Sequence, residues 1–261
     1  MIKQIFACLS LSFLFVSCNS APKNGLKVAA TPVPHAQMLE FIKPDLKEKG
    51  IDLVVVVTTD YNMPNRALAD KEVDANFFEH QPFLDIQVQK FGYPIESIAK
   101  IEIEPMGIYS KKIKSLDDLA DYAKVAVPND PSNEARALIL FEQAGVITLD
   151  DSTNLQATVA NIVKNPKNIQ FFEIDGAMLP RSLSDVSAAA INTNYALTAG
   201  LSPMKDALIL ENKDSPYANV LVVRTEDEDR PDIEALKEAM TSEKMKEFIL
   251  QKYQGAVLPA F

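Results

Sequence analysis

Apolar and polar residues alternate in blocks from residue 26 onward, and the blocks predict strands and helices in turn. Two short apolar runs, 26–30 and 51–58, are rich in the residues typical of buried strands. Between them, the apolar residues of 34–50 recur at helical spacing. This strand–helix–strand order predicts a βαβ unit at the start of the folded part of the chain.

The same alternation continues toward the end of the chain. We predict, in chain order, a helix at 65–71, a strand at 73–78, a helix at 81–90, a strand at 97–109, a strand at 125–127, a helix at 133–144, a strand at 169–174, a helix at 176–183, strands at 188–191, 207–210 and 219–223, and a helical stretch at 231–253. Continuous apolar strands between helices are typical of parallel sheets covered on both faces. We therefore expect an α/β protein whose chain crosses to a second lobe near Tyr109 and returns before residue 220, leaving a cleft lined by strand ends.

The first eighteen residues, MIKQIFACLSLSFLFVSC, have the pattern of an export signal that ends at a cysteine. Lys3 forms a short basic segment, and 5–16 form an apolar segment too short for a stable membrane anchor. A bacterial lipobox usually has leucine three residues before the cysteine, and Phe15 holds that place here, with Leu14 beside it. We expect Cys18 to carry the lipid and hold the protein on the exported side of a membrane. The alternative is an ordinary secretory signal with an incidental cysteine.

The expected division of the chain is a signal peptide at 1–17, a polar tether at 18–25, a first lobe made of 26–109 and 213–261, and a second lobe made of 110–212.

The amino-acid composition narrows the possible functions. Removal of the signal leaves 25 basic and 36 acidic residues, a net charge of −11, which argues against a nucleic-acid partner. Cys8 lies in the signal and Cys18 takes the lipid, so no thiol is expected to remain for a disulfide, a metal site or catalysis.

The sequence lacks the motifs expected of common enzymes. It contains no GxSxG nucleophile motif, no Walker loop and no HExxH motif, and its only histidines are His35 and His80. With 8 glycines in the whole chain, it also lacks a phosphate-binding loop. We therefore expect a protein that is not an enzyme and that needs no cofactor or metal.

Polar and aromatic residues instead gather where the predicted strands end. The five clusters are TTDYNMPN (58–65), DANFFEH (74–80), PNDPSNEAR (128–136), INTNYA (191–196) and SPYAN (215–219). Any single cluster could serve only as a turn or helix cap, because Asn, Asp and Pro are the usual residues there. Five clusters at one edge of the lobes are more than turns require, which favours a ligand site.

These motifs resemble those of the methionine-binding lipoproteins, the MetQ/NlpA family, which are the substrate-binding components of methionine-uptake ABC transporters. The collinear motifs are TPVPHAQMLE (31–40), DANFFEH, IYSKKIKSLDDL (108–119), VPNDPSNEARALIL (127–140), KNPKNI (164–169), INTNYA and SPYAN. Together they cover nearly the entire chain after the tether. The chain departs from the family at Phe77 and Glu79, where relatives often have Tyr and Gln, and at Glu134 and Ala135, where a glycine often precedes the arginine.

The resemblance implies a two-lobed periplasmic-binding-protein fold, type II-like, that closes on methionine between its lobes. It also implies partners: an ABC permease and its ATPase, and a membrane of the cell envelope reached through the N-terminal lipid. Two alternatives stay open. One is a receptor for a methionine-containing dipeptide or another apolar amino acid, and the other is a surface adhesin whose cleft has lost its ligand.

The residue types account for a zwitterionic ligand. A carboxylate needs a planar pair of donors, which Arg136 can supply from the first turn of a helix. Asn133 can cap that helix or donate to the same carboxylate. The ammonium group needs acceptors, and the side-chain oxygens of Asn192 and Asn219 suit it.

A methionine side chain suits an apolar slot walled by aromatic rings, because thioether sulfur packs well against them. The candidates are Tyr61, Phe78 and His80. Phe77 and Phe78 are neighbours on one strand and should point to opposite faces, so we expect Phe78 in the cleft and Phe77 in the core. We interpret His35, at a helix start, as a cap or a residue behind the site.

Overall fold

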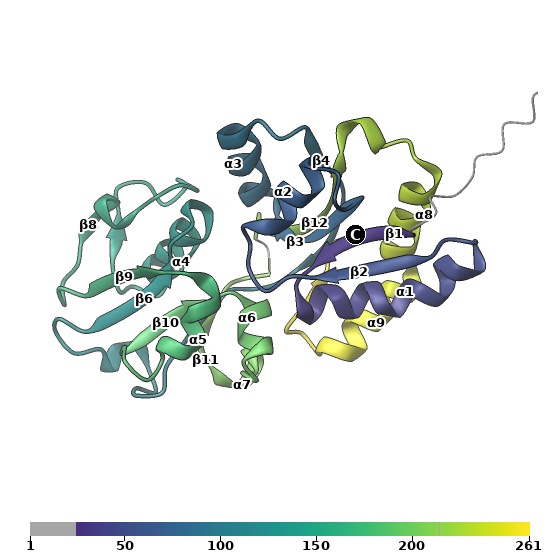
Figure 1. Cartoon of the computed structure of the whole chain (residues 1–261). Coiled ribbons are helices and arrows are strands. Elements are labelled where there is room, and N and C mark those ends of the chain that lie inside the picture. Colours follow the sequence, from purple (N-terminus) through teal and green to yellow (C-terminus); the bar gives the residue numbers. More distant parts are fainter. Residues whose placement is uncertain (1–24, 214) are drawn as a thin grey trace, which may run out of the picture.

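The computed structural model describes residues 25–213 and 215–261, which form two lobes, each built around one β-sheet (Figure 1). The expected signal peptide, tether and lipid-carrying Cys18 lie outside these residues. Within the described part of the chain, no helix is long and apolar enough to cross a membrane. The two-lobed α/β architecture predicted from the sequence is thus confirmed.

The first lobe contains a six-stranded sheet. In spatial order its strands are β13 (Leu258–Pro259), β4 (Ile95–Ile103), β12 (Ala218–Arg224), β3 (Ala75–His80), β1 (Leu26–Ala30) and β2 (Leu53–Val57). Its helices are a π-helix at Pro32–Ala36, α1 (Gln37–Glu48), α2 (Met63–Ala69), α3 (Gln81–Phe91), α8 (Pro231–Met240) and α9 (Glu243–Tyr253).

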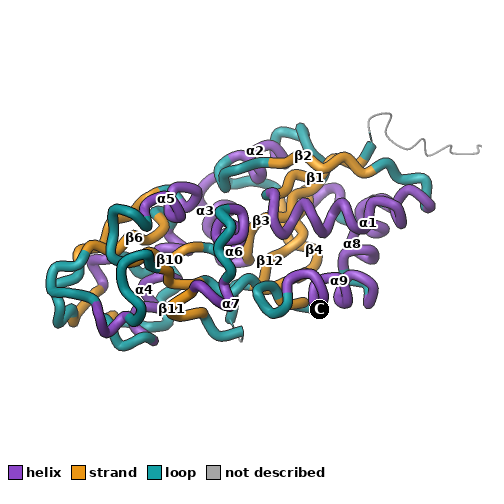
Figure 2. The backbone as a smooth tube through the Cα atoms, turned by 90° about the horizontal axis from the view of Figure 1, so that it is seen from below, coloured by secondary structure: helices purple, strands orange, loops and turns teal. Residues whose placement is uncertain are grey.

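The second lobe contains a five-stranded sheet and a separate strand pair. The sheet order is β11 (Ala207–Leu210), β5 (Gly107–Tyr109), β10 (Ala188–Ile191), β6 (Lys124–Pro128) and β9 (Gln170–Ile174), and the pair is β7 (Thr148–Leu149) with β8 (Ile162–Lys164). The helices are α4 (Pro131–Gln143), α5 (Leu179–Ser182), α6 (Thr193–Thr198) and α7 (Pro203–Asp206). Figure 2 shows α6 at the junction of the lobes, where it contacts the π-helix.

Both sheets are mixed, so the prediction of parallel sheets is wrong for part of each. β1, β2 and β3 are parallel, as are β6, β9 and β10. β12 runs antiparallel to β3 and β4, and β5 runs antiparallel to β10 and β11. The antiparallel strands β5 and β12 each follow a passage between the lobes. There the chain enters a sheet directly, without the helical crossover that connects two parallel strands.

The strand predicted at 97–109 is two strands in different lobes. β4 ends at Ile103 and β5 begins at Gly107, so the first crossing is 104–106 and residues 107–109 belong to the second sheet. Pro105 explains the break, because proline has no N–H to continue a ladder. The first-lobe boundary expected at 109 is therefore corrected. The return crossing runs from the end of β11 to the start of β12.

The first-lobe sheet is covered on both faces, as the apolar runs predicted. On one face, Val28 and Leu221 belong to a core that also includes buried residues of α1, α8 and α9. On the other face, Ala29 and Val222 pack with buried residues of α2 and α3. The helical stretch predicted at 231–253 is two helices, because Ser242 interrupts it and accepts the backbone N–H of Met245 as the cap of α9.

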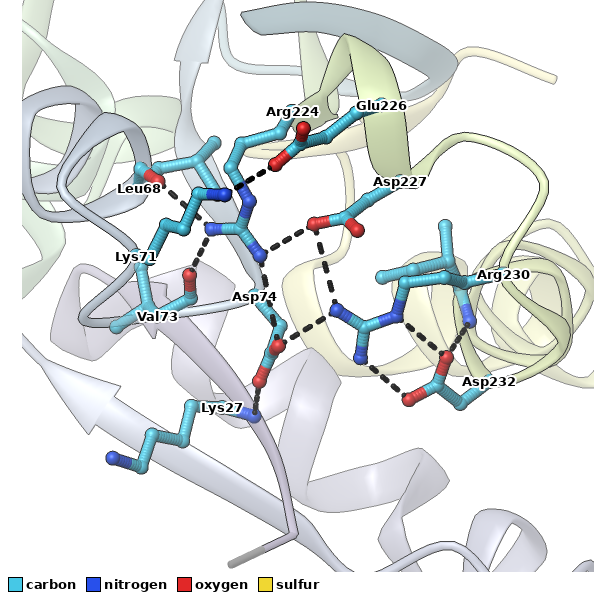
Figure 3. Close-up of polar contacts among 11 residues, drawn as sticks. Lys27, Leu68, Lys71, Val73, Asp74, Arg224, Glu226, Asp227, Arg230 and Asp232 are labelled. Carbon is cyan, nitrogen blue, oxygen red and sulfur yellow. Dashed lines mark hydrogen bonds and ion pairs between the residues drawn. The ribbon is translucent and has the colours of Figure 1, made fainter. Parts of the chain in front are cut away.

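A buried charge network joins this sheet to the start of α8 (Figure 3). We call it the Arg224 network. The Arg224 side chain is 6% exposed; its Nη1 donates to the carbonyls of Leu68 and Val73 at 2.8 and 2.6 Å, and its Nη2 lies 2.5 Å from Asp227 Oδ2. Arg230 pairs with Asp74 at 2.8 Å. The network therefore fastens the ends of α2, β3 and β12 to the segment that leads into α8.

Candidate functional site

A pocket lined mainly by buried residues lies between the two lobes. It is lined by every residue that the sequence analysis proposed for the ligand: Tyr61, Phe78, His80, Asn133, Arg136, Asn192 and Asn219. It is also lined by residues that the analysis did not propose for the ligand: His35, Glu79, Phe83, Glu104, Thr193 and Asn194. The pocket thus brings together residues from both lobes and from the first crossing.

A β-bulge sets the aromatic wall of the pocket. Along the β3–β12 ladder, Glu79 pairs with Val220 and Phe77 with Leu221, so Phe78 has no partner opposite it. Such an extra residue bends a strand and redirects its side chains. Phe77 is buried in the first-lobe core, whereas Phe78 lines the pocket, as expected from their opposite directions.

Tyr61 crosses the cleft. Its hydroxyl donates to Asn194 Oδ1 at 2.7 Å, and its ring lies 4.8 Å from the Tyr195 ring and 5.8 Å from the Phe78 ring, measured between centroids. Burial raises the pKa of Tyr61 well above its usual range, so the hydroxyl is a neutral donor. Tyr61 is therefore both part of the aromatic wall and a contact between lobes.

His80 also joins the lobes. Its Nδ1 accepts the backbone N–H of Phe83 at 3.2 Å, which caps α3, so Nε2 carries the proton and donates to Asn133 Oδ1 at 3.1 Å. Burial and the nearby charge of Arg136 lower the pKa of His80 to about 3. At neutral pH His80 is therefore uncharged, has its proton on Nε2, and links the two lobes through its hydrogen bond to Asn133.

Asn133 organises its neighbours and does not cap α4. Asp130 is the cap, accepting the backbone N–H of Asn133 at 3.0 Å, and the side-chain N–H groups of Asn133 are directed at the Asp130 carboxylate at 2.9 and 3.0 Å. Its oxygen accepts from His80 and from Asn192 Nδ2, the latter at 2.7 Å. The expectation that Asn133 caps the helix is therefore wrong, whereas its contact with a ligand carboxylate stays a prediction.

Arg136 is held at the junction of the lobes. It is 3% exposed, its Nε and Nη2 donate to the Glu211 carboxylate at 3.1 and 2.5 Å, and Nη2 also donates to the Glu104 carbonyl at 2.7 Å. The guanidinium carbon lies 4.4 Å from the centre of the Tyr217 ring. Burial alone would lower the pKa of Arg136, but the charge and hydrogen bonds of Glu211 outweigh burial and raise it.

Glu211 is a site residue that sequence reasoning missed. It stands in the return crossing, and its Oε2 also accepts the backbone N–H of Met106 in the first crossing at 3.2 Å. Glu211 therefore connects Arg136 to both passages between lobes. It lies 75 positions from Arg136, so no local spacing could have paired them.

The side-chain N–H groups of Asn192 and Asn219 donate to protein groups, and the side-chain oxygens are left for a ligand. Asn192 donates to Asn133, and its own Oδ1 is buried with no hydrogen-bond partner among the described residues. Asn219 Nδ2 donates to Glu102 at 2.6 Å and to Glu104 at 3.2 Å, which leaves its oxygen available. Buried acceptors in proteins are normally satisfied, so the Asn192 oxygen points to a donor supplied by a ligand.

Two glutamates and a histidine form a buried cluster behind Asn219, which we call the acid cluster: His35, Glu102 and Glu104. The Nε2 of His35 lies 3.3 Å from Glu102 Oε1 and 3.2 Å from Glu104 Oε1, and its Nδ1 lies 2.6 Å from Thr31 Oγ1. The three residue types could ligate a metal, but Asn219 Nδ2 lies within 3.2 Å of all three and directs N–H groups among them. A donor in that position disfavours a cation and favours a hydrogen-bonded cluster.

Glu79, which lines the pocket, makes the free energy of unfolding depend on pH. Burial raises its pKa to about 8 from an ordinary value of 4.5, while its Oε2 accepts from Asn65 at 2.9 Å. The folded state thus keeps a proton that the unfolded chain loses, so the free energy of unfolding should fall as pH rises from 4.5 to 8, by about 1.4 kcal/mol per pH unit.

Glu79→Gln should remove most of this loss, because a neutral amide replaces the protonated acid. Urea unfolding at pH 5 and pH 8 would measure it, with Glu238→Gln, on the exposed side of α8, as the matched control. An unchanged difference between the two pH values in Glu79→Gln would refute the assignment.

The arrangement suits binding of a small zwitterion with an apolar side chain. Arg136 supplies positive charge, Asn192 and Asn219 supply acceptor oxygens, and the rings of Tyr61 and Phe78 supply an apolar wall. The structure brings all these groups to one pocket although they come from β3, β12, α4, the loop before α2 and the residue that follows β10.

Known proteins share both the sequence and the fold. The methionine-binding lipoprotein MetQ of Bacillus subtilis is 44% identical over 249 residues, covering 92% of this chain and 91% of the relative. The D-methionine-binding lipoprotein MetQ of Escherichia coli is 38% identical over 252 residues, covering 95% of this chain and 93% of the relative. A nutrient binding protein from Burkholderia cenocepacia, solved bound to methionine, has a TM-score of 0.88 and 47% identity, covering 90% of this chain and 100% of that one.

The family profile of the NlpA lipoproteins matches residues 26–261, which is nearly the whole described chain. Both lobes, both crossings and every pocket residue fall inside this match. The chain therefore belongs to the NlpA lipoprotein family.

Proposed function

We propose that this protein binds methionine in the pocket between its lobes and delivers it to an ABC permease and its ATPase. The observation that carries the proposal is the pocket itself, which places a buried arginine, two acceptor oxygens and an aromatic wall around one small volume. A relative of the same fold was solved bound to methionine, which supports the same ligand here.

Each part of methionine has a matching group. The carboxylate meets Arg136, whose guanidinium is already oriented by Glu211 and the Glu104 carbonyl. The ammonium group meets the oxygens of Asn192 and Asn219. The thioether packs against Tyr61, Phe78 and Phe83, whose ring centroids lie within 5.9 Å of one another. The role is binding without chemical conversion.

Methionine should stabilise the closed protein measurably. A ligand that binds only the folded state adds about 2.7 kcal/mol to the free energy of unfolding at a hundred times its dissociation constant and about 4 kcal/mol at a thousand times. Calorimetry should therefore show tight binding, and thermal unfolding should move upward. Titration with glycyl-methionine and with leucine tests the alternative ligands. If saturating methionine leaves the melting temperature unchanged, the proposal fails.

We further propose that Cys18 carries the lipid that holds the protein on the exported face of a membrane in the cell envelope. The support is the signal pattern that ends at this cysteine and the membership in a lipoprotein family. Cys18→Ala should leave the protein unlipidated and free of the membrane fraction, whereas Cys8→Ala should remain there. Retention of Cys18→Ala on the membrane would contradict the anchor.

A further inference from the structure

The acid cluster contains more negative charge than the residues around it can balance. Glu102 is fully buried and Glu104 is 5% exposed; Glu102 lies near the end of β4, and Glu104 is the first residue of the first crossing. Glu104 also lines the pocket. Even if His35 is positively charged, two ionised carboxylates would leave one negative charge unbalanced in the cluster, which is costly for buried groups.

The groups that face Glu104 do not supply the missing positive charge. They are Glu102 of β4, His35 of the π-helix, Asn219 of β12, Arg136 of α4, Tyr61, Tyr109 of β5 and Tyr253 of α9. Arg136 is already balanced by Glu211, with which it shares bonds at 3.1 and 2.5 Å. Burial and the charge of Glu102 raise the pKa of Glu104 well above its usual range, which agrees with a proton retained by the cluster.

The position of Glu104 relates it to the ligand. Arg136 Nη2 donates to the backbone carbonyl of Glu104 at 2.7 Å, so the group proposed for the ligand carboxylate adjoins the residue that carries this acid. The ammonium and carboxylate of an α-amino acid are attached to the same carbon. A ligand whose carboxylate reaches Arg136 therefore brings its ammonium group close to Asn219 and Glu104, which touch each other at 3.2 Å.

We propose that Glu104, held in place by Asn219, Glu102 and His35, supplies the counter-charge for the α-ammonium group of the ligand, so that the protein selects ligands with a free ammonium group. This inference rests on the proposed binding of methionine. In the empty site, the cluster retains a proton. When the ammonium group enters, it replaces that proton, which leaves to solvent, and Glu104 becomes a carboxylate paired with the ligand.

The sign of the pH effect follows from this exchange. An adjacent positive charge favours the ionised acid, so the ligand lowers the pKa of the cluster and binding releases a proton. Affinity should then rise with pH, by up to about tenfold per pH unit while the empty cluster is protonated. A merely structural role for Glu104 would predict no proton release and a flat profile.

The experiment is calorimetry of L-methionine binding from pH 5.5 to 7.5, in two buffers of different ionisation enthalpy at each pH. Wild type should release about half to one proton per methionine and bind more tightly as pH rises. Glu104→Gln should bind at least about thirty-fold more weakly at pH 7.5 and release no proton. Glu102→Gln should show a flatter pH profile of methionine affinity than wild type, because Glu104 then ionises at lower pH.

A second probe tests the ammonium directly. The acid 4-(methylthio)butanoate has the side chain and carboxylate of methionine but no ammonium group, so it should bind far more weakly and release no proton. Glu238→Gln, an exposed residue of α8, serves as the matched control and should behave like wild type. Methionine binding that is independent of pH and releases no proton would overturn this inference and leave the proposed function standing. An absence of methionine binding at every pH would overturn both.

Discussion

Replacing Arg136 with alanine is expected to weaken methionine binding by about thirty-fold to several thousand-fold. The ligand carboxylate would be enclosed in the pocket without its charged partner, a loss of about 2 to 5 kcal/mol. Arg136→Lys keeps the charge but not the planar pair of donors, so its affinity should lie between those of wild type and alanine. Calorimetry on the three proteins measures the effect. Equal affinity in wild type and Arg136→Ala would show that the carboxylate binds elsewhere.

The same change should also weaken the fold. Glu211 would lose the partner that balances its nearly buried carboxylate, which lies 10% exposed. Breaking a buried ion pair from one side costs about 3 to 5 kcal/mol, whereas removing both charges costs less. The double variant Arg136→Ala with Glu211→Gln should therefore unfold at a higher urea concentration than Arg136→Ala alone. Binding must be compared at protein concentrations and temperatures where circular dichroism shows each variant folded.

Replacing Arg224 with methionine should lower the free energy of unfolding by about 3 to 5 kcal/mol and leave methionine affinity unchanged. The change removes the donors to the carbonyls of Leu68 and Val73 and the charge that balances Asp227, while methionine roughly fills the same space. The Arg224 network (Figure 3) lies in the first lobe and contains none of the residues that line the pocket. Urea unfolding would measure the loss.

Arg66→Met provides the control for this prediction. Arg66 pairs with Asp70 on the surface, with side chains 70% and 56% exposed, and such exposed pairs contribute little to stability. Its unfolding midpoint should stay close to that of wild type. If Arg224→Met were no less stable than Arg66→Met, the Arg224 network would be dispensable for the fold.

The periodicity of the sequence predicted the elements that carry most of the core. Residues 26–30, apolar except for Lys27, and the apolar run 188–191 form strands with a neighbour on each side, because local apolar pattern reflects burial directly. The break at 104–106 was missed because the apolar run continues past Pro105 into β5. Strand direction was missed as well, since antiparallel pairing in these sheets depends on which lobe a strand enters, and the apolar pattern does not encode that.

The residues lining the pocket were largely predictable, whereas their partners were not. Tyr61, Phe78 and Arg136 belong to the polar and aromatic clusters that follow predicted strands, and Phe78 and Arg136 also stand in motifs that resemble those of the family. Glu104 directly follows a strand that already contains Glu96 and Glu102, and Glu211 sits in a turn-rich segment, so an acidic residue is ordinary at either place. Their importance arises only when folding removes water from them, and burial of a single charged residue leaves no periodic signal in the sequence.

Two hydrogen bonds join the lobes across the cleft, beside the ring contact of Tyr61 with Tyr195, and contribute to the resistance that the empty protein offers to opening. Tyr61 to Asn194 and His80 to Asn133 are bonds between uncharged groups, each of which contributes about 0.5 to 1.5 kcal/mol net, because water can replace them. Together they favour the shut form by roughly a factor of five to a hundred and fifty. These two polar contacts therefore hold the empty protein shut only weakly.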